Sequence, residues 1–503
     1  MNPSLTDFTS ALQVAGVHVE HHNLAPYASD ASFLTLGTPA LAVFPRTEAE
    51  VLTVVGLAAK NGVKLTMRAK GSSTAGASLA PGGGVVLVTD RLGVVNQFGR
   101  RLGGWALNLV TAKGAAVPVA ELEQHRNEEM YARVGAALST EELDKRLAPL
   151  DWQTAVVPSS GWSTIGGNFA TNAGGNGTPK YGTFNNVIAR LRMVVATKDG
   201  AKVVEVTDRD KIRKMGGGQG LYGVITELDV RVVPKLTKDE LFSAFCTWEG
   251  PDVEKLGDEV GNFMVAMEEV TKPIIAEFMM ADRNLFKAGD PMLTHPELGQ
   301  LFTYPDGSYK FVMMYQGRKD EMDKLPEVAR RFPRIVYKET SAATFKLLLE
   351  LRKASTGKSP GRVAIPGFED IYIEDPRYLG KVLKAIYSIT EGQLPGRPVG
   401  HQYTGGLVVH YRPLAQLTRA EYGTAWDLTQ KLTGAVCRPE MRTIKRREHG
   451  LGLEVYALSS DAERATMKAL KAEFDPLNVF SPHLMTEKPE IHFVGEKLGG
   501  YAA

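Results

Sequence analysis

The sequence has few of the features that mark disulfide-rich or nucleic-acid-binding proteins. Its 503 residues include two cysteines, Cys246 and Cys437. This number is too small for a disulfide scaffold or for an iron–sulfur cluster held by about four thiolates. With 59 basic and 57 acidic residues, the formal net charge is +2. We therefore expect no overall attraction to nucleic acid or to an anionic membrane.

The sequence also lacks long apolar runs. None approaches the roughly 18 residues that span a bilayer, so we expect no transmembrane segment. The N-terminal residues MNPSLTDFTSALQ have neither the basic start nor the apolar block of a secretory signal. We expect a cytoplasmic protein whose two thiols are buried and reduced.

Glycine is abundant, with 51 residues, and it is unevenly distributed. A chain of this length exceeds one ordinary hydrophobic core, so we expect two or three domains. Glycine becomes rarer after residue 235, where methionine, phenylalanine and charged residues become more frequent. We therefore place a domain boundary near residue 235.

Residues 41–90 predict a strand–helix–strand unit. LAVF (41–44) is a short apolar run, and Thr47 to Glu50 form a capping-box pattern that begins a helix. KLTM (64–67) and VVLVTD (85–90) are further strands. This order implies parallel strands joined by a crossover. After residue 235, helices are predicted at 327–332, 345–353 and 378–389, and strands at 334–337 and 370–373.

Three glycine-rich segments stand out, at 70–84, 161–177 and 216–223. The second contains WSTIGGNFATNAGGNG, in which Trp162 and Phe169 favour burial, so a solvated linker is disfavoured. Glycines beside buried anchors indicate close backbone approach to a ligand or to another strand. We interpret the three segments as loops that converge on a large, planar, phosphate-bearing ligand.

Six motifs in order resemble one flavoprotein family. They are PRTEAEV (45–51), GSSTAG (71–76), STIGGNFATNAGG (163–175), YGTFNNVI (181–188), GLYGVITEL (220–228) and DPLNVFSP (475–482). The family is that of vanillyl-alcohol oxidase type. The most similar branch is the FAD-linked D-2-hydroxy-acid dehydrogenases, with D-lactate dehydrogenase, the glycolate oxidase flavin subunit and D-2-hydroxyglutarate dehydrogenase. The resemblance covers about residues 36–485.

The resemblance implies an α+β fold. A two-part FAD-binding domain of the PCMH type would comprise residues 1–235 and a returning C-terminal segment, 441–503. Residues 236–440 would form a substrate (cap) domain of antiparallel sheet and helices.

The resemblance also assigns residues to FAD. They are Arg68, Lys70, Gly71, Ser72, Ser73, Thr74, Gly76, Pro158, Ser159, Ser163, Thr164, Gly166, Gly167, Asn172, Gly174, Gly175, Tyr181, Gly182, Gly220, Gly223, Val224 and Ile225. Relatives with covalent flavin often carry histidine in the first loop, where this chain has Ser73 or Thr74. We therefore predict that FAD is bound non-covalently.

The catalytic assignments come from the C-terminal half. REHGLG (447–452) resembles a Glu-His-Gly signature that makes Glu448 a metal ligand and His449 the general base. ELRKASTG (350–357) resembles the carboxylate-binding segment, with Arg352 as the clamp and Thr356 as an added hydroxyl. The simpler alternatives are a Glu-His pair on a solvated turn and an arginine on a surface helix.

GHQYTGGLVVHY (400–411) resembles the segment in which two histidines flank an Asp-Gly-Asn element. Here Thr404, Gly405 and Gly406 replace that element. His401 and His410 either hold a divalent metal (Zn, Mn or Fe) together with Glu448 or are structural histidines satisfied in the core.

The resemblance predicts oxidation of a small D-2-hydroxy acid. Electrons would pass from FAD to a quinone, a carrier or a separate iron–sulfur subunit that could place the protein at the inner membrane; a homo-oligomer is also compatible. Two alternatives remain open. One is a flavin-carrying electron-transfer subunit without hydroxy-acid activity, and the other is a transferase like the alkyl-glycerone-phosphate synthases.

Overall fold

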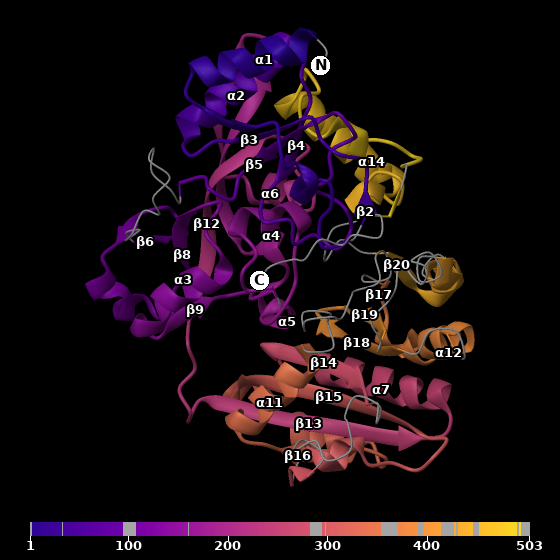
Figure 1. Ribbon diagram of the computed structural model, residues 1–503. Helices are drawn as coiled ribbons and strands as arrows, with labels where there is room; N and C mark the ends of the chain where they lie inside the picture. The colour runs from indigo at the N-terminus through magenta and orange to yellow at the C-terminus, as the bar shows by residue number, and fades with distance from the viewer. Residues whose placement is uncertain are drawn as a thin grey trace. The chain divides into compact units, whose positions relative to one another are not determined.

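The computed structural model (Figure 1) describes residues 3–32, 34–93, 107–158, 160–281, 294–296, 298–353, 371–390, 396–413, 427–428, 431–445, 452–489 and 492–493. The chain divides into two compact units. The first contains residues 1–174, 183–235 and 447–503, and the second contains residues 175–182 and 236–446. Residues 175–182, which lie inside the first predicted domain, thus group with the second unit.

The first sheet of the first unit confirms the predicted parallel strands. Its order is β1 (His18–Glu20), β3 (Leu41–Phe44), β5 (Val85–Val88) and β4 (Leu65–Arg68). β5 pairs in parallel with both β3 and β4. The crossover is α2 (Glu48–Asn61), which begins where the Thr47 hydroxyl accepts the Glu50 N–H at 3.1 Å and ends at Gly62 with φ of 65°. α1 (Pro3–Val14) joins α2 in the core of this layer.

The second sheet of this unit is antiparallel. Its order is β11 (Gly200–Val206), β10 (Ile188–Thr197), β12 (Val224–Pro234), β8 (Met130–Gly135), β6 (Asn108–Thr111) and β7 (Ala116–Val117), with β9 (Trp152–Thr154) also paired to β12. The helices here are α3 (Thr140–Leu147), α4 (Ile165–Thr171), α6 (Arg209–Met215) and α14 (Asp461–Phe474). β2 (Leu34–Thr35) and β21 (His492–Phe493) form a separate pair.

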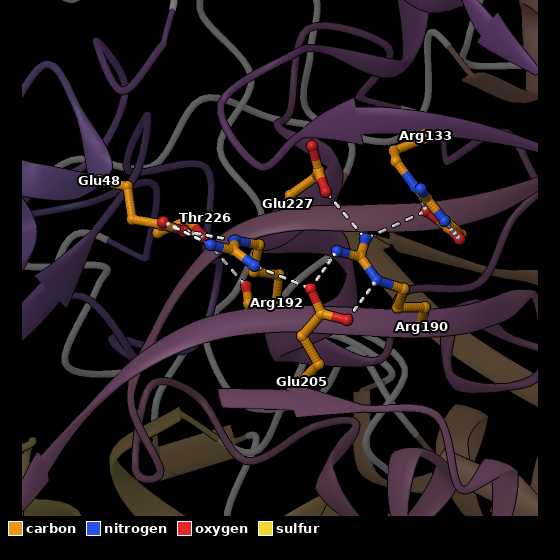
Figure 2. Close-up of polar contacts among 8 residues, drawn as sticks. Glu48, Arg133, Arg190, Arg192, Glu205, Thr226 and Glu227 are labelled. Carbon is orange, nitrogen blue, oxygen red and sulfur yellow. Dashed lines mark hydrogen bonds and ion pairs between the residues drawn. The ribbon is translucent and has the colours of Figure 1, made fainter. Parts of the chain in front are cut away.

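An ion-pair network connects the two layers (Figure 2). Arg192 of β10 binds Glu48 of α2 at 2.9 Å, and Glu205 of β11 at 2.8 Å. Glu205 also binds Arg190 at 2.7 Å. The hydrogen bond from Arg190, and then that from Arg192, lower the pKa of Glu205 to about 2. Arg190 extends the network to Glu227 at 2.8 Å.

The second unit is built on one antiparallel sheet of eight strands. Their order is β16 (Val336–Glu339), β13 (Leu241–Gly250), β15 (Tyr309–Arg318), β14 (Ile275–Met280), β18 (Gly396–Tyr403), β19 (Gly406–Pro413), β17 (Ile371–Ile373) and β20 (Thr443–Lys445). The helices are α5 (Thr178–Tyr181), α7 (Val253–Glu268), α9 (Lys319–Met322), α10 (Leu325–Arg330), α11 (Ala342–Lys353) and α12 (Leu379–Thr390). With the two sheets of the first unit, this arrangement confirms the α+β class.

The two faces of this sheet are covered by different helices. α7 covers one face, where the Phe263 ring lies 5.1 Å from that of Trp248 and 6.2 Å from that of Tyr315, and α12 packs on α7. The opposite face contacts α11 through a core that contains Phe345 and Met279. This distinction locates the candidate site described below, because side chains alternate between faces along a strand.

Most predicted elements are present with shifted ends. The predicted helices at 327–332, 345–353 and 378–389 are α10, α11 and α12, and the predicted strands at 334–337 and 370–373 are β16 and β17. The prediction that residues 161–177 form a loop throughout is wrong, because they contain α4. Cys246 is buried as predicted, whereas Cys437 is partly exposed. None of the helices in the described ranges is long and apolar enough to cross a membrane.

The ion-pair network generates a prediction for acid stability. Because the folded state lowers the pKa of Glu205 from 4.5 to about 2, its carboxylate stabilises the fold above pH 4.5. This contribution is lost as the pH falls from 4.5 through 2. Glu205→Gln should therefore lower the free energy of unfolding by about 1 kcal/mol at pH 7 and have little effect near pH 2. Urea denaturation at both pH values tests this, with Glu121→Gln, at an exposed position of a 3-10 helix, as the control. Equal effects at both pH values would contradict it.

Candidate functional site

The loop that follows β4 has the backbone geometry of an anion-binding turn. Gly71 and Gly76 have φ of 67° and 78°, a region that favours glycine. The Ser73 hydroxyl accepts the N–H groups of Ala75 at 3.3 Å and Ala77 at 3.4 Å, which fixes the turn. Within the described part of the chain, the buried Oγ1 of Thr74 has no hydrogen-bond partner. A glycine-rich loop with an unused hydroxyl fits a phosphate-bearing cofactor.

Arg68 holds this loop in place through hydrogen bonds of its side chain. Its guanidinium donates to the carbonyl oxygens of Ser29 at 2.8 Å and Pro26 at 3.1 Å, and to the Ser78 hydroxyl at 3.3 Å. A side chain at Gly71 would collide with this guanidinium. The predicted role of Arg68 in cofactor binding is therefore more consistent with positioning the loop than with direct contact.

The second glycine-rich segment uses its small residues for close packing. Thr164 begins α4 by accepting the Gly167 N–H at 3.1 Å. A Cβ at Gly166 would lie 2.8 Å from that of Ala136, and a Cβ at Gly167 would lie 3.8 Å from that of Ala69, in the first loop. The helix interrupts the predicted loop because the cap at Thr164 satisfies its first turn.

Two of the predicted FAD residues in this segment have internal partners. The Ser163 hydroxyl bonds to the Ser160 carbonyl at 2.6 Å and to the Asn168 side chain at 2.7 Å. Asn172, with φ of 53°, accepts the Asn185 N–H at 2.9 Å. Their side chains therefore stabilise the segment itself.

The third segment completes the convergence. The N–H groups of Gly217 and Gln219 donate to carbonyls of α4, those of Phe169 at 3.1 Å and Ala170 at 2.8 Å. A Cβ at Gly220 would lie 2.6 Å from Cγ of Met67, in β4. The three glycine-rich segments therefore meet at the end of β4, as predicted.

The other predicted FAD residues are placed as follows. Lys70, Ser72 and Ser73 are partly exposed in the first loop, Pro158 and Gly174 are buried, Gly223 has φ of 156°, and Val224 and Ile225 begin β12. Ser159 lies outside the described residues. Gly175, Tyr181 and Gly182 belong to the second unit. There the Gly177 N–H donates to Ile274 at 2.9 Å, and Lys180 binds Glu321 at 2.5 Å.

The C-terminal segment also reaches the place where the three glycine-rich segments converge, here called the cradle, although the sequence assigned no FAD-binding residue to it. The Leu453 N–H donates to the Ala75 carbonyl at 3.1 Å. A side chain at Gly452 would collide with that carbonyl. Phe480 forms a parallel bridge with Leu65 of β4. The DPLNVFSP motif (475–482) was the feature of the sequence that indicated a role for this segment.

The second unit contains a buried polar group on its sheet. Nδ1 of His401 lies 2.6 Å from Oε1 of Glu277, and both side chains are 4% exposed. The His401 and His410 rings are 5.3 Å apart and nearly perpendicular, at 83°. Because Met279 and Val399 pack on α11, the period of two places Glu277 and His401 on the same face.

The remaining catalytic predictions are only partly covered by the structure. Arg352 lies in the last turn of α11, the helix that packs on this face. Thr356, Glu448 and His449 lie outside the described residues. Two of the three predicted metal ligands are thus neighbours, but no group of three or more His, Cys, Asp or Glu residues that could hold a metal occurs within the described ranges.

Comparison with known proteins places this site among flavoproteins. Residues 39–205 match a family model described as FAD binding domain. An uncharacterised FAD-linked oxidoreductase of Mycobacterium tuberculosis is 30% identical over 39% of this chain, and the match spans 38% of the relative. Glycolate oxidase subunit GlcD of Bacillus subtilis is 23% identical over 92% of both chains. D-lactate dehydrogenase of Archaeoglobus fulgidus is 22% identical over 62% of this chain and 61% of the relative.

Solved structures share the fold. Wild-type BBE-like 1 of Physcomitrella patens has a TM-score of 0.63 at 16% identity and covers 96% of this chain and 100% of its own. An alkyldihydroxyacetonephosphate synthase has a TM-score of 0.58 at 15% identity. The match covers 88% of this chain and 76% of the synthase.

Gly220 tests the packing of the cradle. Its φ is 82°, and a Cβ would lie 2.6 Å from Cγ of Met67, whereas Gly83, with φ of 74°, has no atom within 4 Å of such a Cβ. Gly83→Ala should lower the free energy of unfolding by about 1–2 kcal/mol through backbone strain alone. Gly220→Ala should lower it by about 1–3 kcal/mol more, because the methyl group also overpacks the site. Urea denaturation of both variants tests the difference, and equal losses would contradict it.

Proposed function

The chain belongs to the FAD-linked flavoproteins of vanillyl-alcohol oxidase type, and we propose that it oxidises a small D-2-hydroxy acid, such as lactate or glycolate. The observation that carries this proposal is the buried polar group Glu277, His401 and His410 on the sheet face that contacts α11. A buried ion pair is often no more stabilising than apolar residues of similar volume. A function therefore accounts for this polar group better than stability does. The similarity to GlcD, which includes the second unit, supports a hydroxy-acid substrate.

Substrate binding is assigned to the end of α11 and the residues after it. The Arg352 guanidinium would hold the substrate carboxylate through two parallel hydrogen bonds, which fixes the orientation of the acid. The Thr356 hydroxyl would add a third bond. A clamp of this kind recognises the carboxylate and leaves the substrate side chain to be selected elsewhere.

Proton removal is assigned to His449. An imidazole has a pKa near neutrality, so it can accept the proton of the 2-hydroxyl group. FAD, when bound, would supply the hydride acceptor. The first loop has Ser73 and Thr74 in place of the histidine found in covalent flavoproteins, so FAD is proposed to be non-covalent.

A divalent metal (Zn, Mn or Fe) is proposed at His401, His410 and Glu448. When bound there, it would polarise the substrate hydroxyl. Glu277 would orient His401 by holding its Nδ1, as second-sphere carboxylates do at other metal sites. The alternative, that both histidines are structural, is compatible with the same contacts.

The electrons must leave FAD for an acceptor. Because the chain has two cysteines, a cluster would belong to a separate iron–sulfur subunit; a quinone or a soluble carrier would serve equally. We propose a cytoplasmic protein that reaches the membrane only through such a partner.

Two other functions are supported by particular observations. The alkyldihydroxyacetonephosphate synthase neighbour favours a transferase on the same fold. The Thr404-Gly405-Gly406 turn, in place of Asp-Gly-Asn, favours an electron-transfer subunit without hydroxy-acid chemistry.

Anaerobic reduction separates these functions. Addition of D-lactate or glycolate should bleach the flavin absorbance of the purified protein. His449→Ala should slow bleaching by about 100-fold or more, because the general base is lost, with the FAD content unchanged. Failure of every D- and L-2-hydroxy acid to bleach a protein that retains FAD would contradict the dehydrogenase.

The metal proposal is tested by content as well as by rate. Elemental analysis should find about one divalent ion per chain, and His401→Ala or His410→Ala should lose it while retaining FAD. Chelation should slow flavin reduction and leave the oxidised flavin spectrum unchanged. A metal-free protein that is fully active would show that both histidines are structural.

A further inference from the structure

Two buried polar side chains of the first unit have no hydrogen-bond partner among the described residues. Gln219 is 3% exposed, and both its Oε1 and its Nε2 are buried without a partner. Ser481 is fully buried, and its Oγ is likewise without a partner. Each such group costs about 1–3 kcal/mol relative to a satisfied one. Neither residue is among those that the sequence assigned to FAD.

The same two residues have left-handed backbone. The φ of Gln219 is 53° and that of Ser481 is 43°. This backbone conformation is unfavourable for residues other than glycine. Such strain persists where the surrounding structure imposes it, and it is concentrated at functional sites. Gln219 lies in a glycine-rich segment. A glycine at this position would adopt the left-handed backbone without strain, but it would supply no side chain.

Gln219 and Ser481 come from distant parts of the sequence, and both lie at the cradle. A Cβ at Gly220, the residue after Gln219, would lie 3.8 Å from Oγ of Ser481. The Ser481 N–H donates to the Leu65 carbonyl of β4 at 2.8 Å, and the Gln219 N–H donates to the Ala170 carbonyl of α4 at 2.8 Å. Both residues are therefore held where the three glycine-rich segments converge.

A buried lysine holds the two segments together. Nζ of Lys471 donates to the carbonyl oxygens of Leu221, at 3.0 Å, and Phe480, and it pairs with Asp475 at 2.6 Å. Asp475 in turn accepts the N–H groups of Val479 and Phe480, both at 2.8 Å. The positions of Gln219 and Ser481 are thus fixed by bonds that involve neither of their side chains.

We propose that the carboxamide of Gln219 and the hydroxyl of Ser481 bind FAD directly, so that the C-terminal segment supplies part of the cofactor site. The inference rests on the assignment of FAD to the first unit. A carboxamide offers both donors and an acceptor, and a hydroxyl offers both as well. This pair therefore suits a ligand such as FAD, which carries phosphate, hydroxyl, carbonyl and ring N–H groups.

The test measures FAD affinity and apoprotein stability together. Gln219→Ala and Ser481→Ala should each weaken FAD binding to the apoprotein by about 5- to 20-fold, as measured by flavin fluorescence titration. Neither should lower the melting temperature of the apoprotein, because no hydrogen bond within the protein is removed. Ser481→Gly, which also relieves the backbone strain, should weaken binding while raising that temperature.

Asn478→Ala is the matched control. Asn478 has nearly the same backbone, with φ of 54°, and lies in the same segment, but it is exposed, so FAD affinity should not change. Wild-type affinity in the Gln219 and Ser481 variants would overturn the inference, and so would a loss of apoprotein stability parallel to the loss of affinity. A wild-type protein that binds no FAD would overturn the cofactor assignment as well. A wild-type protein that binds FAD but is reduced by no hydroxy acid would overturn only the proposed reaction, and the affinities would still decide the inference.

Discussion

The close approach of several backbone segments to the end of β4 is the constraint on which the cofactor site depends. Gly220 packs on Met67, and Gly167 lies beside Ala69. Phe480 bridges Leu65, and Arg68 anchors the segment at residues 26–29. A side chain at Gly220 would separate the third segment from β4. One short strand therefore organises contributions from the N-terminal, middle and C-terminal parts of the chain.

Local patterns in the sequence were sufficient to predict most helices and strands and to identify the glycine-rich segments. The capping box at Thr47 and the periodic valines of α2 describe interactions within one helix, so they can be read without a fold. The same reasoning failed for residues 161–177. Glycine-rich composition indicates a loop, whereas the Thr164 cap and the packing of Gly166 on Ala136 stabilise α4. Tertiary contact outweighed propensity there.

Contacts between distant residues were not accessible from one sequence. Glu277 and His401 are 124 residues apart, and their pairing follows from the register of β14 and β18. Gln219 and Ser481 are farther apart still, and nothing near either residue indicates the other. The motif at 475–482 showed that the C-terminal segment matters, but only its bridge to β4 shows where it acts. The motifs therefore indicated which segments belong together, and the geometry shows which residues hold them in place.

The two units use buried polar groups in different ways, and this difference bears on function. In the first unit, the Lys471–Asp475 pair is satisfied by backbone groups and holds the C-terminal segment in place. In the second unit, Glu277 and His401 lie beside apolar residues such as Met279 and Val399 on the face that contacts α11. Apolar residues of similar volume would be at least as stable there. Hydrogen bonds to backbone groups therefore account for the first pair, whereas we propose that the second holds an imidazole in one orientation for metal binding or proton transfer.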